Sequence, residues 1–153
     1  MRLVAWLAVS FLPAVIGVRF PAPGYYARLE KPSWGPPAWL FGPVWTVLYA
    51  LMGVGAWLVA GTSGSRARAP LMLWGAQLAL NAAWTPVFFG VRSPGLALVN
   101  IVLLWFALVA TVVAFWSRRT IAGILLLPYL AWVSFATALN FEIWRRNRGR
   151  GSG

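Results

Sequence analysis

The sequence contains no cysteine and no histidine, and its only acidic residues are Glu30 and Glu142. Disulfides and thiolate metal sites are therefore excluded, and the commonest metal ligand and general base is missing. Two isolated carboxylates cannot build a Ser-His-Asp site or a carboxylate cage for a metal. The single lysine, Lys31, lies outside the predicted helices, which excludes a Schiff-base chromophore in the bundle. We expect no metal and no cofactor.

Charge is scarce as well, because only 10% of the residues are charged and 61% are hydrophobic. Ordinary soluble domains have roughly a quarter of their residues charged. Five stretches are free of charge, at 3–18, 32–65, 69–91, 93–117 and 120–141. A helix needs about 20 apolar residues to cross a bilayer core of ~30 Å, and the first stretch reaches this only with Phe20 or local thinning of the bilayer. The sequence predicts a multi-pass integral membrane protein.

The expected fold class is an all-α membrane protein, a bundle of five transmembrane helices. Their predicted ranges are about 3–19, 38–60, 70–89, 94–116 and 120–146. Pro70 and Pro94 stand at favoured first positions of a helix, and Pro86 predicts a kink. These helices form one domain over 1–146, and the basic, glycine-rich tail over 147–153 is predicted to be disordered.

The stretch 20–37 contains five prolines and cannot be a continuous helix. It also carries Tyr25, Tyr26 and Trp34, aromatic residues that a simple linker does not need. We therefore expect an ordered first loop that caps one end of the bundle and closes a pocket there.

The net charge of +11 arises from basic residues in loops and tails, which favours topology signals and lipid headgroup contacts over nucleic-acid binding. Five basic residues fall on the side of the N-terminus and eight on the other side. This bias predicts a cytoplasmic C-terminus. Residues 1–17 also resemble a cleaved signal peptide, but Arg19-Phe20-Pro21 follows directly and we expect a retained first helix.

The chain has 11 tryptophans, most of them near the predicted span ends, where an interfacial belt explains them. Trp45, Trp105 and Trp132 fall deeper and are candidates to line a flat pocket for a large planar ligand. Polar residues also lie within the predicted spans: Gln77, Asn81, Asn100, Tyr129 and Asn140. Gln77 and Asn81 share one helix face. Such residues either join helices by hydrogen bonds or line a pocket, and both roles stay open.

Three segments together resemble the TspO/translocator-protein family. The segment 25–37, YYARLEKPSWGPP, resembles the family's first-loop signature. The segment 77–90, QLALNAAWTPVFFG, is similar to its third-helix motif, and PYLAW at 128–132 with FATALN at 135–140 is similar to its fifth helix. The matches come in the right order and cover the chain from about Tyr25 to Arg146.

The resemblance implies a dimeric five-helix receptor or transporter-like protein that binds protoporphyrin, haem, and benzodiazepine-type or sterol-like ligands. The pocket residues that it implies are Tyr26, Pro36, Trp45, Gln77, Asn81, Asn100, Trp132 and Ala136. Some members are reported to degrade protoporphyrin in light, and Trp45 and Trp132 match the two tryptophans implicated as catalytic. A porphyrin-degrading enzyme and a lipid-binding structural bundle are therefore the alternative functions.

Three positions depart from the family pattern. Tyr25 stands where tryptophan is usual, and Asn100 stands where an aspartate is frequent. Phe141 replaces the tyrosine that a sterol-type motif over 139–145 requires, and that motif is only hypothesis-grade when intact. We therefore do not predict cholesterol binding.

Two further expectations concern association and ligand charge. Gly75, Ala79 and Ala83 repeat every four residues, which favours a homodimer through this helix or close packing inside the bundle. Haem iron would find only tyrosine or methionine as an axial ligand. The basic residues near the first loop are candidates to pair with propionates, although Glu30 could neutralise Lys31 instead. They are Arg19, Arg28 and Lys31.

Overall fold

The computed structural model describes residues 3–18, 32–35, 40–62, 67–91 and 93–147, and within these ranges it contains helices and turns but no strand. The elements are α1 (Leu3–Ser10), α2 (Leu12–Val18), α4 (Phe41–Ala60), α5 (Arg68–Thr85), the π-helix η3 (Pro86–Gly90), α6 (Pro94–Arg118) and α7 (Thr120–Asn147). Because α1 leads into α2 and α5 into η3, the elements form five rods. The predicted all-α bundle is confirmed.

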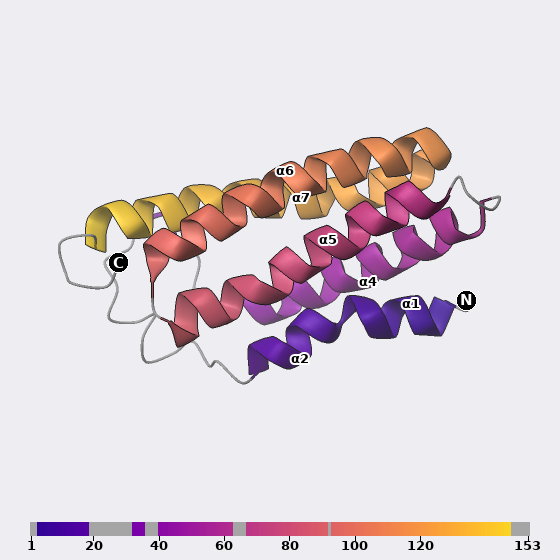
Figure 1. The fold of residues 1–153 in the computed structure, drawn as a ribbon. Coiled ribbons are helices and arrows are strands. Elements are labelled where there is room, and N and C mark those ends of the chain that lie inside the picture. The colour runs from indigo at the N-terminus through magenta and orange to yellow at the C-terminus, as the bar shows by residue number, and fades with distance from the viewer. Residues whose placement is uncertain (1–2, 19–31, 36–39, 63–66, 92, 148–153) are drawn as a thin grey trace.

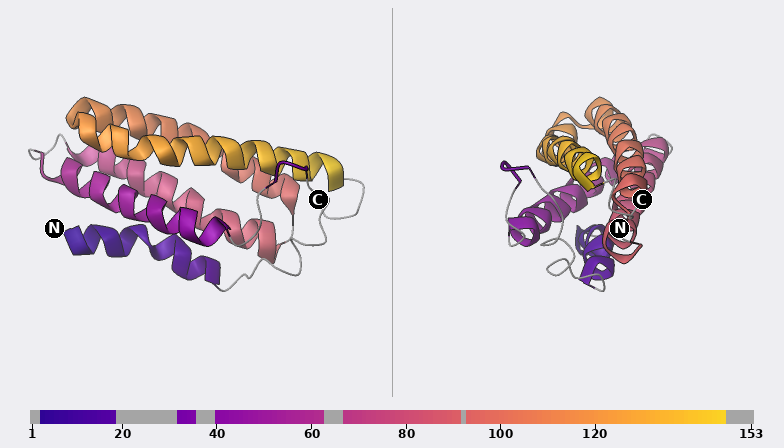
Figure 2. Two further views of the ribbon diagram at one scale, coloured as in Figure 1. Left: turned by 180° about the vertical axis from the view of Figure 1, so that it is seen from behind. Right: turned by 90° about the vertical axis from the view of Figure 1, so that its left-hand side faces the viewer.

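The five rods pack side by side with their long axes roughly aligned (Figure 1). Helices α6 and α7 contact each other along their length, α5 packs on α6, and α4 packs on α7. The first rod closes the bundle, since α1 contacts α4 and α2 contacts α5 (Figure 2). Helix α1 begins at one end of the bundle and α7 ends at the other, as an odd number of spans requires.

Two prolines interrupt the helices. The helix predicted over 3–19 is divided at Phe11, because Pro13 lacks a backbone donor and its ring crowds the carbonyl four residues earlier. The chain turns there, with the Ala14 N–H donating to the Phe11 carbonyl at 3.0 Å. The irregularity expected at Pro86 takes the form of the π-helix η3, whose Val91 N–H donates to the Pro86 carbonyl at 2.9 Å.

Helix α6 is apolar on its outer face as well as on its buried face. Ile101, Leu104 and Leu108 are buried against the bundle, whereas the side chains of Leu103 and Phe106 are 54% and 62% exposed. A helix at a water surface would be polar on that outer side. Within the part of the chain that the structure describes, three helices are long and apolar enough to cross a membrane, at Gly42–Ala60, Pro94–Arg118 and Thr120–Asn147. The chain is a multi-pass integral membrane protein.

Much of the predicted first-loop cap, including Tyr25, Tyr26 and Pro36, lies outside the described residues, as do residues 148–153 of the predicted tail. The described part of the loop, Pro32–Gly35, forms a turn in which the Gly35 N–H donates to the Pro32 carbonyl at 3.0 Å. The Trp34 ring of this turn meets the ring of Phe135 of α7 edge-on at 5.7 Å.

Glycines allow two helix pairs to approach closely. A Cβ atom at Gly53 of α4 would lie 2.8 Å from Leu7 Cδ2 and 3.0 Å from Leu7 Cα in α1. A Cβ atom at Gly123 of α7 would lie 2.7 Å from Trp116 Cε3 and 2.9 Å from Trp116 Cα in α6. Because backbone atoms lie within 3.0 Å at both positions, a side chain would require the helices to separate.

We expect Gly123→Ala to lower the free energy of unfolding by about 1–3 kcal/mol, the usual cost of an overpacked contact. The matched control is Gly42→Ala, since a Cβ atom at Gly42 would meet nothing within 4 Å. Unfolding in mixed detergent, followed by circular dichroism, measures both variants. Equal stability of Gly123→Ala and the wild type would show that α6 and α7 are not held this closely.

Candidate functional site

A chain of hydrogen bonds between buried side chains crosses the centre of the bundle. The Tyr49 hydroxyl of α4 donates to Asn81 Oδ1 of α5 at 2.9 Å, and Asn81 Nδ2 donates to the Tyr129 hydroxyl of α7 at 2.6 Å. The Tyr129 hydroxyl in turn donates to Gln77 Oε1 at 2.8 Å. Gln77 Nε2 ends the chain by donating to the Trp74 carbonyl at 2.9 Å. These four side chains therefore join α4, α5 and α7, which is the helix-joining role left open for Gln77 and Asn81.

Trp45 of α4 lies against both tyrosines of this chain. Its ring stacks on that of Tyr49 with centroids 5.4 Å apart and an interplanar angle of 27°. Tyr129 meets the same indole edge-on at 6.0 Å and 71°. Trp45 and Tyr49 are four residues apart and so share one face of α4. Tyr49 was not singled out from the sequence, although this spacing could have indicated its contact with Trp45.

Trp132 of α7 completes the aromatic cluster. Its ring is nearly perpendicular to that of Trp45, at 6.4 Å and 89°, and it lies 5.4 Å from Phe135. Phe135 contacts Trp34 of the first loop, so the cluster extends from the loop to the polar chain. Ala136 is partly buried against the core, four residues along α7 from Trp132. The structure thus brings Trp45 and Trp132 together, and it links Gln77 and Asn81 to them through the two tyrosines that contact Trp45.

The remaining predicted pocket residues are placed differently. Asn100 of α6 donates to the Leu80 carbonyl of α5 at 2.9 Å. Its amide therefore links α5 to α6 and is not a member of the polar chain described above. Trp105 lies at the seam of α6 and α7, where its indole N–H donates to Ser134 Oγ at 2.8 Å. It was one of three candidates for the planar pocket, and its ring contact is with Phe106. Tyr26 and Pro36 lie outside the described residues.

A second polar junction lies nearer the C-terminal end of α7. Asn140 is 1% exposed; its Oδ1 accepts from the Trp84 indole at 2.9 Å and its Nδ2 donates to the Pro94 carbonyl at 2.9 Å. Trp84 also stacks on Phe88 of η3 at 4.9 Å. This single amide therefore joins α7 to α5 and to the start of α6.

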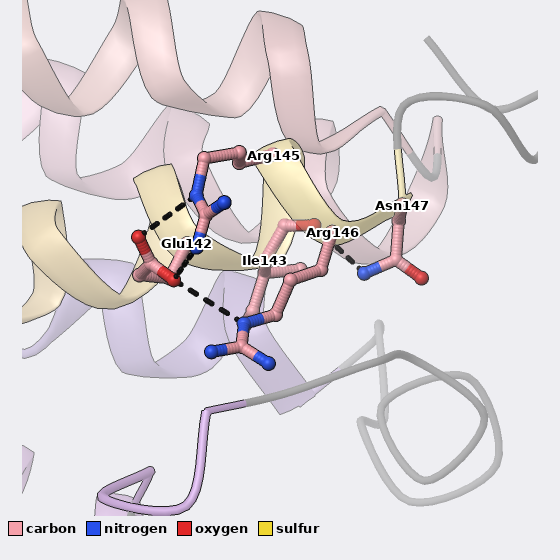
Figure 3. A network of polar contacts seen from close by, with 5 residues as sticks. All are labelled: Glu142, Ile143, Arg145, Arg146 and Asn147. Atoms are coloured by element: carbon pink, nitrogen blue, oxygen red, sulfur yellow. Dashed lines mark hydrogen bonds and ion pairs between the residues drawn. The ribbon is translucent and has the colours of Figure 1, made fainter.

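Glu142 lies near the end of α7 and pairs with two arginines (Figure 3). Arg145 contacts both carboxylate oxygens, at 3.1 Å from Nε to Oε1 and 2.7 Å from Nη2 to Oε2, and Arg146 Nε lies 3.2 Å from Oε2. One carboxylate thus partly balances two guanidinium groups. No group of three potential metal-ligating His, Cys, Asp or Glu side chains occurs in the part of the chain that the structure describes.

The site therefore consists of large aromatic rings beside a closed set of neutral hydrogen bonds. Tyrosine hydroxyls, amides and indoles carry no charge at neutral pH. Such a site can hold a ligand by stacking and apolar contact.

The sequence matches one family model and is similar to several proteins of known name. The model of the TspO/MBR family matches residues 3–145. The chain is 50% identical to the translocator protein of Homo sapiens over 128 residues, which cover 82% of this chain and 76% of that protein. It is 46% identical over 143 residues to the tryptophan-rich protein TspO of Chlorobaculum tepidum, covering 92% of this chain and 90% of that protein.

A third relative is protein CrtK of Rhodobacter capsulatus, 43% identical over 135 residues that cover 87% of this chain and 84% of that protein. The match of the family model spans nearly the whole bundle, including both helices that carry the aromatic cluster and the helix that carries the amides. The chain belongs to the TspO/MBR family.

Proposed function

We propose that this protein binds a planar tetrapyrrole, protoporphyrin IX or haem, as a membrane receptor or transporter-like protein. We include hydrophobic ligands of benzodiazepine or sterol-like type in the same proposal. The observation that carries it is the perpendicular pair of Trp45 and Trp132, whose centroids lie 6.4 Å apart. A macrocycle can stack its face on one indole while its edge meets the other, and both geometries are favoured for aromatic rings.

The surroundings of this pair support a hydrophobic ligand. Trp45, Trp132 and Ala136 are partly buried beside the main core, so each side chain keeps some surface available for contact. Trp34 of the first loop reaches the same cluster through Phe135. Ordinary ligand sites are likewise lined by aromatic and apolar groups with a few polar ones that set orientation.

The surroundings of the methionines and tyrosines among the described residues support a mode of binding without coordination of haem iron. Met52 is fully buried and its sulfur lies 3.8 Å from Gln77 Nε2, whereas the Met72 side chain is 68% exposed. The hydroxyls of Tyr49 and Tyr129 are engaged in the polar chain. Met52, Tyr49 and Tyr129 thus already contact protein partners inside the core, which disfavours them as axial ligands for haem iron. Binding then rests on apolar contact and on charge pairing with the propionates, for which Arg19, Arg28 and Lys31 stay candidates outside the described residues.

The homodimer is part of the proposal and is assigned to α5. Within a single chain Gly75 and Ala79 are exposed, Ala83 is partly exposed, and a Cβ atom at Gly75 would meet nothing within 4 Å. Gly75 and Ala79 thus make little contact inside the bundle, which supports the dimer over the alternative of packing within one chain. Small residues on a lipid-facing helix let two backbones approach closely.

We expect Trp45→Leu and Trp132→Leu each to weaken protoporphyrin binding by about 1–3 kcal/mol, the scale of losing one aromatic stacking contact with a nucleic-acid base. Quenching of tryptophan fluorescence by added protoporphyrin measures the affinity. The control is Trp57→Leu on the same helix, whose side chain is 40% exposed and which we expect to be neutral. Unchanged affinity in both cluster variants would exclude these tryptophans from the site.

The same titrated sample, kept under light with oxygen present, separates binding from degradation. A stable porphyrin absorbance band agrees with a receptor or carrier. Loss of the band in the wild type, but not in Trp45→Leu or Trp132→Leu, would assign porphyrin breakdown to this site.

We expect metal-free protoporphyrin to bind about as tightly as haem, because the proposed mode of binding uses apolar contact and propionate pairing instead of coordination of iron. Esterification of the propionates should weaken both ligands, since it removes the charges that basic side chains would pair with. Absorbance titration measures all four ligands. Haem binding a hundredfold tighter than the metal-free ring, with the spectrum of a ligated iron, would contradict this mode of binding.

Ala79→Leu is expected to shift the protein from dimer to monomer in detergent, because the larger side chain separates the two α5 backbones. Size-exclusion chromatography with light scattering measures the particle. Ala131→Leu on the exposed side of α7 is the matched control. A dimer that persists in Ala79→Leu would point to another helix.

A further inference from the structure

Asn81 bridges two tyrosines that come from different helices. Its Oδ1 accepts from the Tyr49 hydroxyl of α4, and its Nδ2 donates to the Tyr129 hydroxyl of α7. The next hydrogen bond, from Tyr129 to Gln77, determines which end of the Asn81 amide faces Tyr129. Because the Tyr129 hydroxyl donates its single hydrogen to Gln77 Oε1, its oxygen can only accept a hydrogen bond from Asn81 Nδ2. Asn81 is 5% exposed, and both ends of its amide are engaged.

The same two tyrosines form two walls around the Trp45 indole. Tyr49 lies parallel to it at 5.4 Å and 27°, and Tyr129 approaches it edge-on at 6.0 Å and 71°. Stacked and edge-to-face arrangements are the favoured geometries for pairs of aromatic rings. A tyrosine whose hydroxyl is fixed by a hydrogen bond cannot rotate about its side-chain bonds without breaking that bond. The amide of Asn81 therefore constrains both rings that contact Trp45.

We propose that Asn81 is a positioning residue for Trp45: by holding the hydroxyls of Tyr49 and Tyr129, it sets the orientation of the indole on which the ligand stacks. The effect on ligand binding rests on the proposed function, whereas the effect on the indole does not. The action of Asn81 runs through the two tyrosines, because its oxygen accepts from Tyr49 and its nitrogen donates to Tyr129.

Asn140 offers a matched control for a purely structural role. It is also a buried amide that joins three helices, through the Trp84 indole of α5 and the Pro94 carbonyl of α6. Loss of a buried hydrogen-bonding partner destabilises the fold at either position. Of these two asparagines, Asn81 is bonded to the tyrosines that contact Trp45 and Asn140 is not, so the two variants differ in what happens to that indole.

The experiment uses the full chain labelled with 5-fluorotryptophan in detergent micelles, with the Trp45 fluorine resonance assigned by its absence in Trp45→Phe. Without ligand, Asn81→Leu is expected to shift or split this resonance. Tyr49→Phe and Tyr129→Phe keep the rings but lose the hydroxyls, and we expect shifts in the same direction. Asn140→Leu is expected to lower the thermal midpoint and leave the Trp45 resonance in place.

Protoporphyrin titration is the second readout. Asn81→Leu is expected to weaken binding about three- to tenfold, the scale of losing the preferred geometry of one aromatic pair, and Asn140→Leu to change it less than twofold. If Asn81→Leu does not fold, Tyr49→Phe and Tyr129→Phe carry the same test.

Three outcomes would decide against the positioning role. An unmoved Trp45 resonance in both hydroxyl-deletion variants would overturn it. An equal shift in Asn140→Leu would make the effect a general loss of packing. Weaker binding by Asn81→Leu with an unmoved resonance would mean that Asn81 contacts the ligand itself. Failure of the proposed function is distinct: the wild type would not bind protoporphyrin, while the shifts caused by Asn81→Leu would remain.

Discussion

Amide and hydroxyl groups inside a membrane need hydrogen-bonding partners from the protein itself, because lipid offers none at that depth. Helix α5 carries Gln77 and Asn81 on one face, and the partners come from Tyr49 of α4 and Tyr129 of α7. The bonds leave these helices little freedom to slide or rotate against one another. Apolar packing alone would fix their relation less sharply, since lipid chains compete for the same contacts.

The aromatic site follows from this arrangement. The hydroxyls of Tyr49 and Tyr129 belong to the polar chain, and their rings both contact Trp45. The Tyr49 ring is stacked on the indole, and the Tyr129 ring meets it edge-on. Trp132 then approaches Trp45 from α7, one turn beyond Tyr129. A polar junction in the middle of the bundle thereby holds an apolar surface next to it.

The sequence predicted an all-α bundle of five rods, because charge-free length and proline position act locally. It placed Pro86 at an irregular point, which is the π-helix η3, but it missed the break at Phe11. The apolar run 3–18 is continuous in the sequence, and it conceals the break that Pro13 causes in the helix. The pairing of Trp45 with Trp132 followed from family motifs, whereas the separate position of Trp105, bonded to Ser134 of α7, depended on the rotation of α6.

What the sequence determined by itself is the chemistry available to this protein. The absence of histidine and cysteine, the presence of only two carboxylates and the charge-free stretches limit the side chains inside the membrane to apolar, aromatic and neutral polar ones. Tertiary structure decided how each polar residue is used. Three asparagines lie within predicted spans and look equivalent in the sequence, yet their partners differ. Asn81 bonds two tyrosines, and Asn100 bonds a backbone carbonyl. Asn140 bonds an indole and a backbone carbonyl. The reason is that a hydrogen-bond partner on another helix is set by the rotation and height of both helices, which no local pattern encodes.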